Sequence, residues 1–163
     1  MLFRSGEALR QGLTAAPDFV KPNRNEASGF ANYPIDSIDK AAEATQKFFA
    51  AGAKSVAISL GAAGMIWQGA ADGALFISQP APLAKCSPVG CGDAALAGFA
   101  VAHERGLSDE ETLRLATACG SANCLAEAPG RVDAREVSRL AREIRVRRIV
   151  PREFSRPATV EAQ

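Results

Sequence analysis

The order of apolar and polar positions along the chain predicts five helices. Apolar side chains recur three or four residues apart in some of them, and capping residues precede others. Gly52 follows one helix at the position that usually ends it. Ser108 and Glu111 form a capping box, and Asp133 and Glu136 repeat that pattern. The predicted helices span residues 5–15, 37–51, 91–105 and 109–126, and the fifth follows Asp133.

Short apolar runs between these helices predict strands. Residues 55–60 form the clearest run, and residues 18–20 form a briefer one. Residues 65–67 and 74–77 flank a Gly-Ala-Ala-Asp-Gly turn, which indicates a hairpin. Helices that alternate with short apolar strands favour an α/β fold with a mainly parallel sheet.

Composition and charge narrow the class of protein. The chain has 163 residues, enough for one domain, and 47% of them are hydrophobic and 23% charged, as in ordinary globular proteins. The formal net charge of +1 supplies no strong field, so we expect no nucleic-acid partner. Nine arginines follow position 130, and we interpret that basic end as a solvated helix and tail. No apolar run approaches the roughly 18 residues of a membrane span, so we expect no membrane and a cytoplasmic location.

The cysteines do not have the spacing of a metal site. They lie along the sequence as two pairs, each with four residues between its members: Cys86 and Cys91, and Cys119 and Cys124. The only histidine is His103. A zinc site usually needs two-residue spacers or histidine partners. We therefore expect free thiols in a reducing compartment.

The stretch from residue 88 to 99 carries the clearest chemical signal. Gly90 and Gly92 allow a tight turn, and the helix that begins there aims unpaired N–H groups and a positive dipole outward. Such a helix N-terminus is suited to binding an anion. Asp93 lies in the first turn, either as a functional acid or only as a favourable partner of the helix dipole.

Two common nucleotide motifs are excluded at this stretch. A dinucleotide fingerprint needs a hydrophobic strand before the first glycine, and the proline-rich segment 80–88 cannot supply one. A Gly-x4-Gly-Lys-Ser/Thr segment is also absent from the sequence.

Four segments together resemble a known family. Residues 89–98 resemble the signature of the PfkB (ribokinase-like) carbohydrate kinases, a Gly-Ala-Gly-Asp pattern followed by a helix of small residues, with Cys91 in place of the usual Ala. Residues 21–26 resemble the family's Asn-x-x-Glu motif, and residues 59–64 its Ser/Thr-Leu-Gly-x-x-Gly loop. Residues 119–123 resemble the helix that lines the adenine pocket. The residues of these segments are most similar to those of the hexose-phosphate kinases, which include 1-phosphofructokinase, 6-phosphofructokinase and tagatose-6-phosphate kinase.

The resemblance implies catalytic roles. Asp93 would take the proton from the acceptor hydroxyl of a sugar or sugar phosphate. The backbone N–H groups of Gly90, Cys91, Gly92 and Asp93 would form an anion hole for the transferred phosphoryl group of ATP.

The resemblance also implies sites for the nucleotide and for two cations. Asn23 and Glu26 would organise Mg²⁺ and its waters. The resemblance also implies a monovalent cation, K⁺, bound mostly by the backbone oxygens of a second set of residues. The implied nucleotide-binding residues are Lys21, Asn23, Ser59, Gly61, Gly64, Ser121 and Asn123. The implied monovalent-cation residues are Ser87, Val89, Ala126, Ala128 and Gly130.

Each of these residues also has a plain structural interpretation. The alternative interpretations are that Asn23 is a turn residue after Pro22 and that Glu26 is a solvated surface residue. The hydroxyls of Ser59 and Ser121 are suited to bonding the nearby backbone.

The resemblance further implies that the chain is incomplete. Family members are about twice as long, and their sugar site and lid lie before the part that matches. Residues 1–149 are therefore interpreted as the C-terminal, nucleotide-binding part of a three-layer αβα kinase domain, and residues 150–163 as a polar tail. We expect self-association or pairing with the missing half. The alternatives are a noncatalytic nucleotide-binding remnant and an interaction protein that recruits another chain through a sheet edge.

Overall fold

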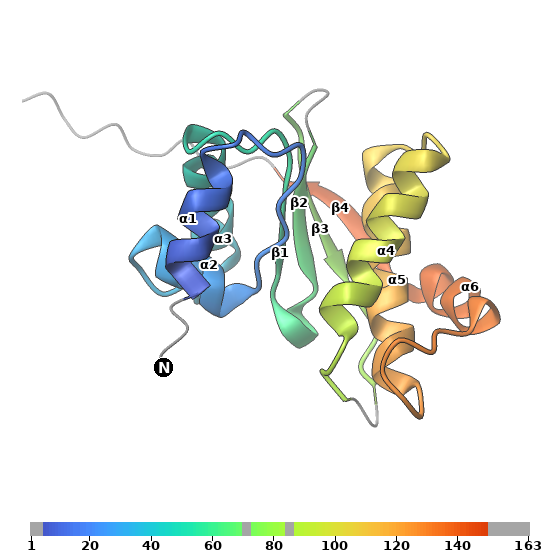
Figure 1. Cartoon of the computed structure of the whole chain (residues 1–163). Coiled ribbons are helices and arrows are strands. Elements are labelled where there is room, and N and C mark those ends of the chain that lie inside the picture. The colour runs from blue at the N-terminus through green and yellow to red at the C-terminus, as the bar shows by residue number, and fades with distance from the viewer. Residues whose placement is uncertain (1–4, 70–72, 84–86, 150–163) are drawn as a thin grey trace, which may run out of the picture.

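A three-layer arrangement organises the chain (Figure 1). The computed structural model describes residues 5–69, 73–83 and 87–149, so the predicted tail lies outside the described residues. Helices α1 (Ser5–Leu13), α2 (Arg24–Ala31) and α3 (Ile38–Ala50) lie on one face of a sheet. Helices α4 (Cys91–Glu104), α5 (Asp109–Leu125) and α6 (Ala134–Glu143) lie on the other face. The predicted α/β class is confirmed.

The described sheet contains four strands in chain order: β1 (Val56–Ser59), β2 (Met65–Gln68), β3 (Leu75–Gln79) and β4 (Arg145–Ile149). All three neighbouring pairs are antiparallel, so the prediction of a mainly parallel sheet is wrong for these strands. Short connections join β1 to β2 and β2 to β3, whereas a parallel pair needs a crossover of a dozen or more residues.

Parallel pairing occurs only beside β1 in the described part of the chain. Two isolated bridges there join Val20 to Val56 and Asn23 to Ser59. The connection between these segments runs through α2 and α3, which is the long crossover that parallel strands require. The predicted strand at residues 18–20 is thus reduced to an edge segment that holds the start of α2 against the end of β1.

Alternation along β1 divides the core between the two faces of the sheet. Val56 and Ile58 are fully buried with Phe48 against the α1–α3 layer. Ala57 faces the α4–α5 layer, where the rings of Trp67 and Phe99 have centroids 5.0 Å apart. Each face of the sheet has its own apolar cluster, so helices fix the sheet from both sides.

Capping residues confirm the predicted starts of α3 and α5. The Ser37 side chain accepts a hydrogen bond from the Lys40 N–H, and Ser108 and Glu111 form the predicted capping box. Gly52 follows α3 with a φ of 108°, a left-handed conformation that favours glycine.

The region after Asp133 differs from the prediction. Asp133 caps α6 through the Arg135 N–H, but Glu136 binds the Arg139 guanidinium instead of completing a capping box. Helix α6 ends at Glu143, and residues 145–149 form β4 because the free edge of β3 offers them backbone partners. Helix α2 was also not predicted, although its capping residues are present in the sequence.

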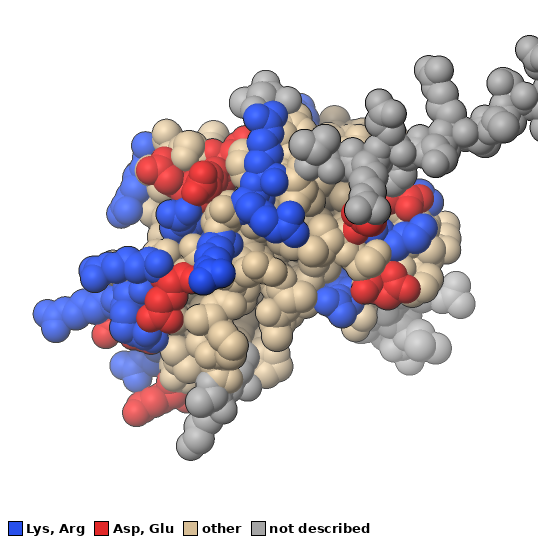
Figure 2. Space-filling view, turned by 180° about the vertical axis from the view of Figure 1, so that it is seen from behind, with Lys and Arg blue, Asp and Glu red and all other residues tan. Residues whose placement is uncertain are grey.

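Charged side chains on the α6 side of the molecule are interspersed in sign. Figure 2, which shows the molecule from behind, has basic side chains gathered there with acidic ones among them. Arg139 lies within 2.6 Å of Glu136 and 2.7 Å of Glu143. The predicted solvated face of this helix is confirmed. Among the described residues, no helix is both long and apolar enough to cross a membrane.

Candidate functional site

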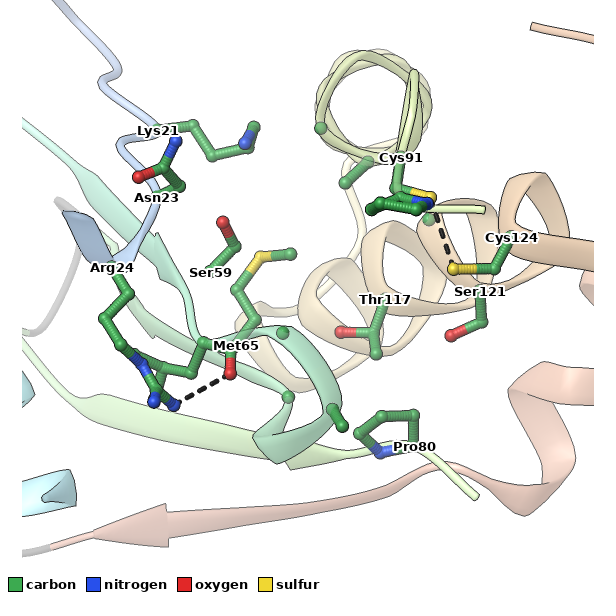
Figure 3. A pocket seen from close by; sticks show the side chains of 18 of the residues that line it. Lys21, Asn23, Arg24, Ser59, Met65, Pro80, Cys91, Thr117, Ser121 and Cys124 are labelled. Atoms are coloured by element: carbon green, nitrogen blue, oxygen red, sulfur yellow. Dashed lines mark hydrogen bonds between the residues drawn. The ribbon is translucent and has the colours of Figure 1, made fainter. Parts of the chain in front are cut away.

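A cavity of about 1080 Å³ lies between two walls that come from opposite layers of the fold (Figure 3). The first wall comprises residues 19–26 and the loop after β1, and the second comprises the start of α4 and part of α5. The volume is that of a site for a sizeable small molecule. The predicted site residues that line it are Lys21, Asn23, Glu26, Ser59, Gly61, Gly64, Cys91, Gly92, Asp93 and Ser121.

The first wall is organised by the N-terminus of α2. Asn23 Oδ1 accepts the Glu26 N–H at 2.9 Å, and the Asn23 N–H donates to Glu26 Oε2 at 2.8 Å. This reciprocal capping box satisfies the first turn of α2 with its own side chains. It also fixes the Glu26 carboxylate at the edge of the cavity, and one carboxylate oxygen stays outside the box.

Lys21 lies on the same wall and extends toward the second one (Figure 3). A Cβ on Gly92 would lie 3.4 Å from the Lys21 ammonium. Burial lowers the pKa of Lys21, opposed by the negative charges of Glu26 and Asp93. The ammonium forms no ion pair or hydrogen bond with any of the described residues. A half-buried cation without such a partner is favourable to an anionic ligand.

The loop after β1 completes the first wall. Gly61 has a φ of 66° and Gly64 a φ of 95°, both in the left-handed region. A Cβ on Gly64 would lie 1.8 Å from the Ser78 carbonyl oxygen, so only glycine fits there. The Arg24 guanidinium donates a hydrogen bond to the Leu60 carbonyl at 2.9 Å, and this bond connects the loop to α2. Ser59, the last residue of β1, lies beside Asn23 through the parallel bridge.

The second wall begins with an open helix N-terminus. Gly90 is the N-cap of α4, with a φ of 78° and no side-chain cap. The Cys91 N–H donates to the Pro88 carbonyl at 3.3 Å. Within the described part of the chain, the N–H groups of Gly92 and Asp93 have no hydrogen-bond acceptor. These two amides and the helix dipole are free to bind an anion, with the Asp93 carboxylate alongside.

The thiol of Cys91 lies at the same end of α4. Its Sγ is 3.2 Å from the Ser87 carbonyl and 3.3 Å from Cys124 Sγ. Cys91 and Cys119 are free cysteines, as expected. The expectation is wrong for Cys124, which is disulfide-bonded, because sequence spacing does not reveal which sulfurs the fold brings together. Cys86 lies outside the described residues.

Several predicted residues lie behind the second wall and not on it. Asn123 is only 1% exposed and bonds to the backbone on either side of it. The predicted monovalent-cation residues belong to the two loops that this amide joins. The predicted residues in this position are Gly90, Asn123, Ser87, Val89, Ala126, Ala128 and Gly130.

Sequence reasoning missed part of the lining. Arg24 and Thr117 line the cavity, and the proline-rich connector contributes Pro80 and Leu83. Pro80 also packs near Gly64. A connector with three prolines gives no periodic signal, so only the fold places it against the loop after β1.

The donors at the cavity fit a hydrated divalent cation better than a fully coordinated one. No group of three or more His, Cys, Asp or Glu that could hold a metal occurs within residues 5–69, 73–83 and 87–149. Asn23 and Glu26 present one carboxylate oxygen beyond the capping box. Mg²⁺ usually binds through one or two carboxylates, waters and substrate phosphates, so this donor set fits a water-mediated ion.

An open glycine-rich helix N-terminus of this kind is typical of proteins that bind phosphate groups. The profile of the pfkB family carbohydrate kinases matches residues 4–133. The chain belongs to this family, which confirms the resemblance.

Curated relatives and a solved structure agree with this assignment. The chain is 38% identical over 119 residues to 1-phosphofructokinase from Haemophilus influenzae, which covers 72% of this chain and 37% of that protein. It is 37% identical over 148 residues to 1-phosphofructokinase from Rhodobacter capsulatus, covering 90% and 46%. A structure of Escherichia coli phosphofructokinase-2 in complex with potassium superposes with a TM-score of 0.75 at 28% identity, covering 84% and 44%. This chain therefore spans less than half the length of each.

Proposed function

We propose that this chain is the nucleotide-binding half of a kinase that transfers the γ-phosphoryl group of ATP to a hydroxyl of a sugar phosphate. The observation that carries the proposal is the open N-terminus of α4, beside which lies the Lys21 ammonium, a cation with no ion-pair or hydrogen-bond partner among the described residues. Both features favour a phosphate between the two walls. Fructose 1-phosphate is the acceptor to test first, because the curated relatives described above are named 1-phosphofructokinase.

Asp93 and the backbone amides at the start of α4 have different roles at the reacting centre. The Asp93 carboxylate takes the proton from the acceptor hydroxyl as that oxygen attacks phosphorus. The N–H groups of Gly92 and Asp93 stabilise the charge on the transferred group. The N–H groups of Gly90 and Cys91, which the resemblance also implies, would join this anion hole only after a rearrangement, because the Cys91 N–H donates to the Pro88 carbonyl and Gly90 does not line the cavity. Lys21 neutralises the same charge from the opposite wall.

Residues of both walls, and the loops behind the second one, hold the rest of the nucleotide and its cations. Ser59, Gly61 and Gly64 bind the phosphates and ribose, and Ser121 lies beside the base. Asn23 and Glu26 would hold Mg²⁺ through water, and this ion would supply charge neutralisation to the phosphates of ATP. Escherichia coli phosphofructokinase-2 is described as a complex with potassium, which supports a monovalent cation for this chain too. We assign that cation to the loops of residues 87–89 and 126–130 because the family resemblance implies them.

The missing part of the kinase is proposed to join at residues 18–23. These residues bond to β1 on one side, while the backbone groups of Phe19 and Lys21 meet no partner in the described part of the chain. The opposite edge strand, β4, presents arginines at 145, 147 and 148, and charged edges resist added strands. Leu96, which lines the cavity, is an apolar side chain that is 44% exposed.

A binding and mixing experiment tests this proposal. Calorimetry should detect ATP binding that strengthens with Mg²⁺. Alone, the chain should self-associate and show no kinase activity, because an acceptor held by nothing forfeits most of the roughly 7–11 kcal/mol that positioning supplies. Activity should appear when the preceding half of a related kinase is added, measured by coupled ADP release.

Three results would change the conclusion. A monodisperse monomer that phosphorylates fructose 1-phosphate unaided would overturn the incomplete-kinase proposal. Nucleotide binding without turnover in the mixture would favour a noncatalytic remnant. No binding of ATP or ADP would leave an interaction protein.

A further inference from the structure

The last turn of α5 contains a buried amide between the two loops behind the second wall. Asn123 is 1% exposed, and its Nδ2 donates to the Val89 carbonyl at 2.8 Å. The same nitrogen lies 3.3 Å from Cys91 Sγ. Its Oδ1 accepts the Gly130 N–H at 2.8 Å. Because a carbonyl and an N–H flank the amide, its orientation is fixed by its neighbours.

A buried amide is costly unless its polar atoms are bonded, and these bonds use both ends of the side chain. The surrounding backbone is packed closely around it. A Cβ on Gly90 would lie 3.5 Å from both amide atoms and 3.2 Å from Pro129 Cβ. Gly90 also has a φ of 78°, so the tight turn before α4 is pressed against this amide.

Asn123 bonds to the turn at residues 88–90, and this turn sets the direction of the open N-terminus of α4. Gly90 supplies no side chain to cap the helix, and its carbonyl accepts the Ala94 N–H at 2.9 Å to begin it. The direction of the first amides therefore depends on how residues 88–90 are held from behind. The bond from Asn123 to the Val89 carbonyl is a side-chain contact that fixes this turn.

We propose that Asn123 is a positioning residue: it holds the turn at residues 88–90 so that the Gly92 and Asp93 amides face the transferred phosphoryl group, and it links that turn to the loop at residues 126–130. The effect on phosphoryl binding rests on the proposed function. Asn123 itself touches neither nucleotide nor acceptor. Its interaction with Gly130 makes the geometry of one loop depend on the other.

Asn123→Asp tests the two bonds separately in the 163-residue chain. The carboxylate still accepts from Gly130 but repels the Val89 carbonyl, whereas a protonated Asp donates to that carbonyl again. At pH 8 we expect Mg²⁺-ATP affinity to fall roughly tenfold while Mg²⁺-ADP affinity falls less, because ADP lacks the group that the amides bind. Toward pH 5 the difference from wild type at the same pH should shrink.

Two further variants separate positioning from general stability. Asn123→Ala removes both bonds without adding charge, so its loss of ATP-over-ADP preference should not depend on pH. Thr45→Val is the matched control, because it removes a buried hydroxyl bonded to Gln68 at 3.1 Å on the far side of the sheet. It should lower the melting temperature and leave the ATP-over-ADP preference unchanged.

The proposal would be overturned if both Asn123 variants lost ATP affinity and ADP affinity to the same extent. It would also be overturned if neither variant lost affinity for either nucleotide. If the wild-type chain binds neither nucleotide, the proposed function fails, and hydrogen exchange at Ala94, whose N–H donates to the Gly90 carbonyl at 2.9 Å, decides the positioning role. Faster exchange there in Asn123→Asp at pH 8, reversed at pH 5 relative to wild type, would support it. Unchanged exchange would overturn it.

Discussion

Helices α2 and α4 both begin at the cavity, but their first turns are satisfied in different ways. At α2, Asn23 and Glu26 form a capping box from the helix's own side chains. At α4, Gly90 offers no side chain, and the Gly92 and Asp93 amides meet no acceptor in the described part of the chain. One N-terminus is closed, and the other is open.

The difference teaches how the same helix-end chemistry serves two purposes. A closed N-terminus is stable without a ligand, so it fixes a wall and places the Glu26 carboxylate. An open N-terminus leaves part of its hydrogen bonding to the ligand, which makes binding of an anion favourable. The variants below alter one end at a time, ordered from the largest expected effect to the smallest.

Removing the acid at the open end should have the largest effect. In the kinase completed with the preceding half, Asp93→Asn should lower kcat at least 10²-fold with little change in ATP affinity, because an amide cannot accept the hydroxyl proton. Steady-state kinetics measure both quantities. Glu104→Gln, at the far end of the same helix, is the control and should be nearly neutral. Near-normal turnover in Asp93→Asn would remove this carboxylate from the mechanism.

Lys21 faces the open end from the opposite wall, and its charge should be visible in pH dependence. Burial lowers its pKa from 10.5, so the free chain loses this proton earlier than an exposed lysine does. ATP affinity should therefore fall as the pH rises from 7 toward 10. Lys21→Arg, which stays charged, should remove that dependence, and Lys21→Met should weaken binding roughly tenfold or more at pH 7.

The same shift has a defined sign for stability. The unfolded chain holds the Lys21 proton more tightly than the folded chain, so the penalty for burying the charge is fully present at neutral pH. Lys21→Met should therefore raise the free energy of unfolding at pH 7 while it weakens ATP binding. A variant that lost both would indicate that Lys21 is needed for packing.

Glu26→Gln separates the cap of α2 from its charge. Glutamine keeps the capping box, so the melting temperature should change little. Loss of the carboxylate should weaken the Mg²⁺ dependence of ATP binding roughly tenfold, as for other groups that hold a metal indirectly. Titration calorimetry with and without Mg²⁺ measures this. An unchanged metal dependence would make Glu26 a capping residue alone.

The closed end itself should contribute the smallest effect. Asn23→Ala removes the cap of α2 and should cost about 1 kcal/mol of stability. Ser37→Ala removes the cap of α3 at a comparable cost, away from the cavity. Chemical denaturation should give similar losses for both, but only Asn23→Ala should also weaken nucleotide binding. Equal nucleotide affinities would refute a ligand role for Asn23.

Local signals in the sequence anticipated most of the helices and the central motif. Ser37, Ser108 and Glu111 mark helix starts correctly because a capping residue acts within its own first turn. The capping box of α2 has the same form at Asn23 and Glu26, but the sequence analysis interprets these residues as a metal motif, a turn and a solvated surface, and does not predict a helix there.

Non-local pairing was less predictable. Residues 145–149 become a strand because β3 leaves its outer edge free, and nothing within that segment reveals the pairing. The antiparallel order of the sheet follows from short connections between strands whose neighbours are fixed only in the folded chain.

The candidate site also has a part that local sequence signals predict and a part that depends on non-local contacts. The sequence by itself determined where the open helix start lies, since Gly90, Gly92 and Asp93 shape it through the local geometry of one turn. Only the tertiary structure decided their surroundings: it placed the Lys21 ammonium across from Gly92 and buried Asn123 behind Val89. Residues 21, 92 and 123 are far apart along the chain, and contacts between such positions depend on how the layers pack. Sequence periodicity records which side of an element is buried, but it does not record which distant side chain meets it.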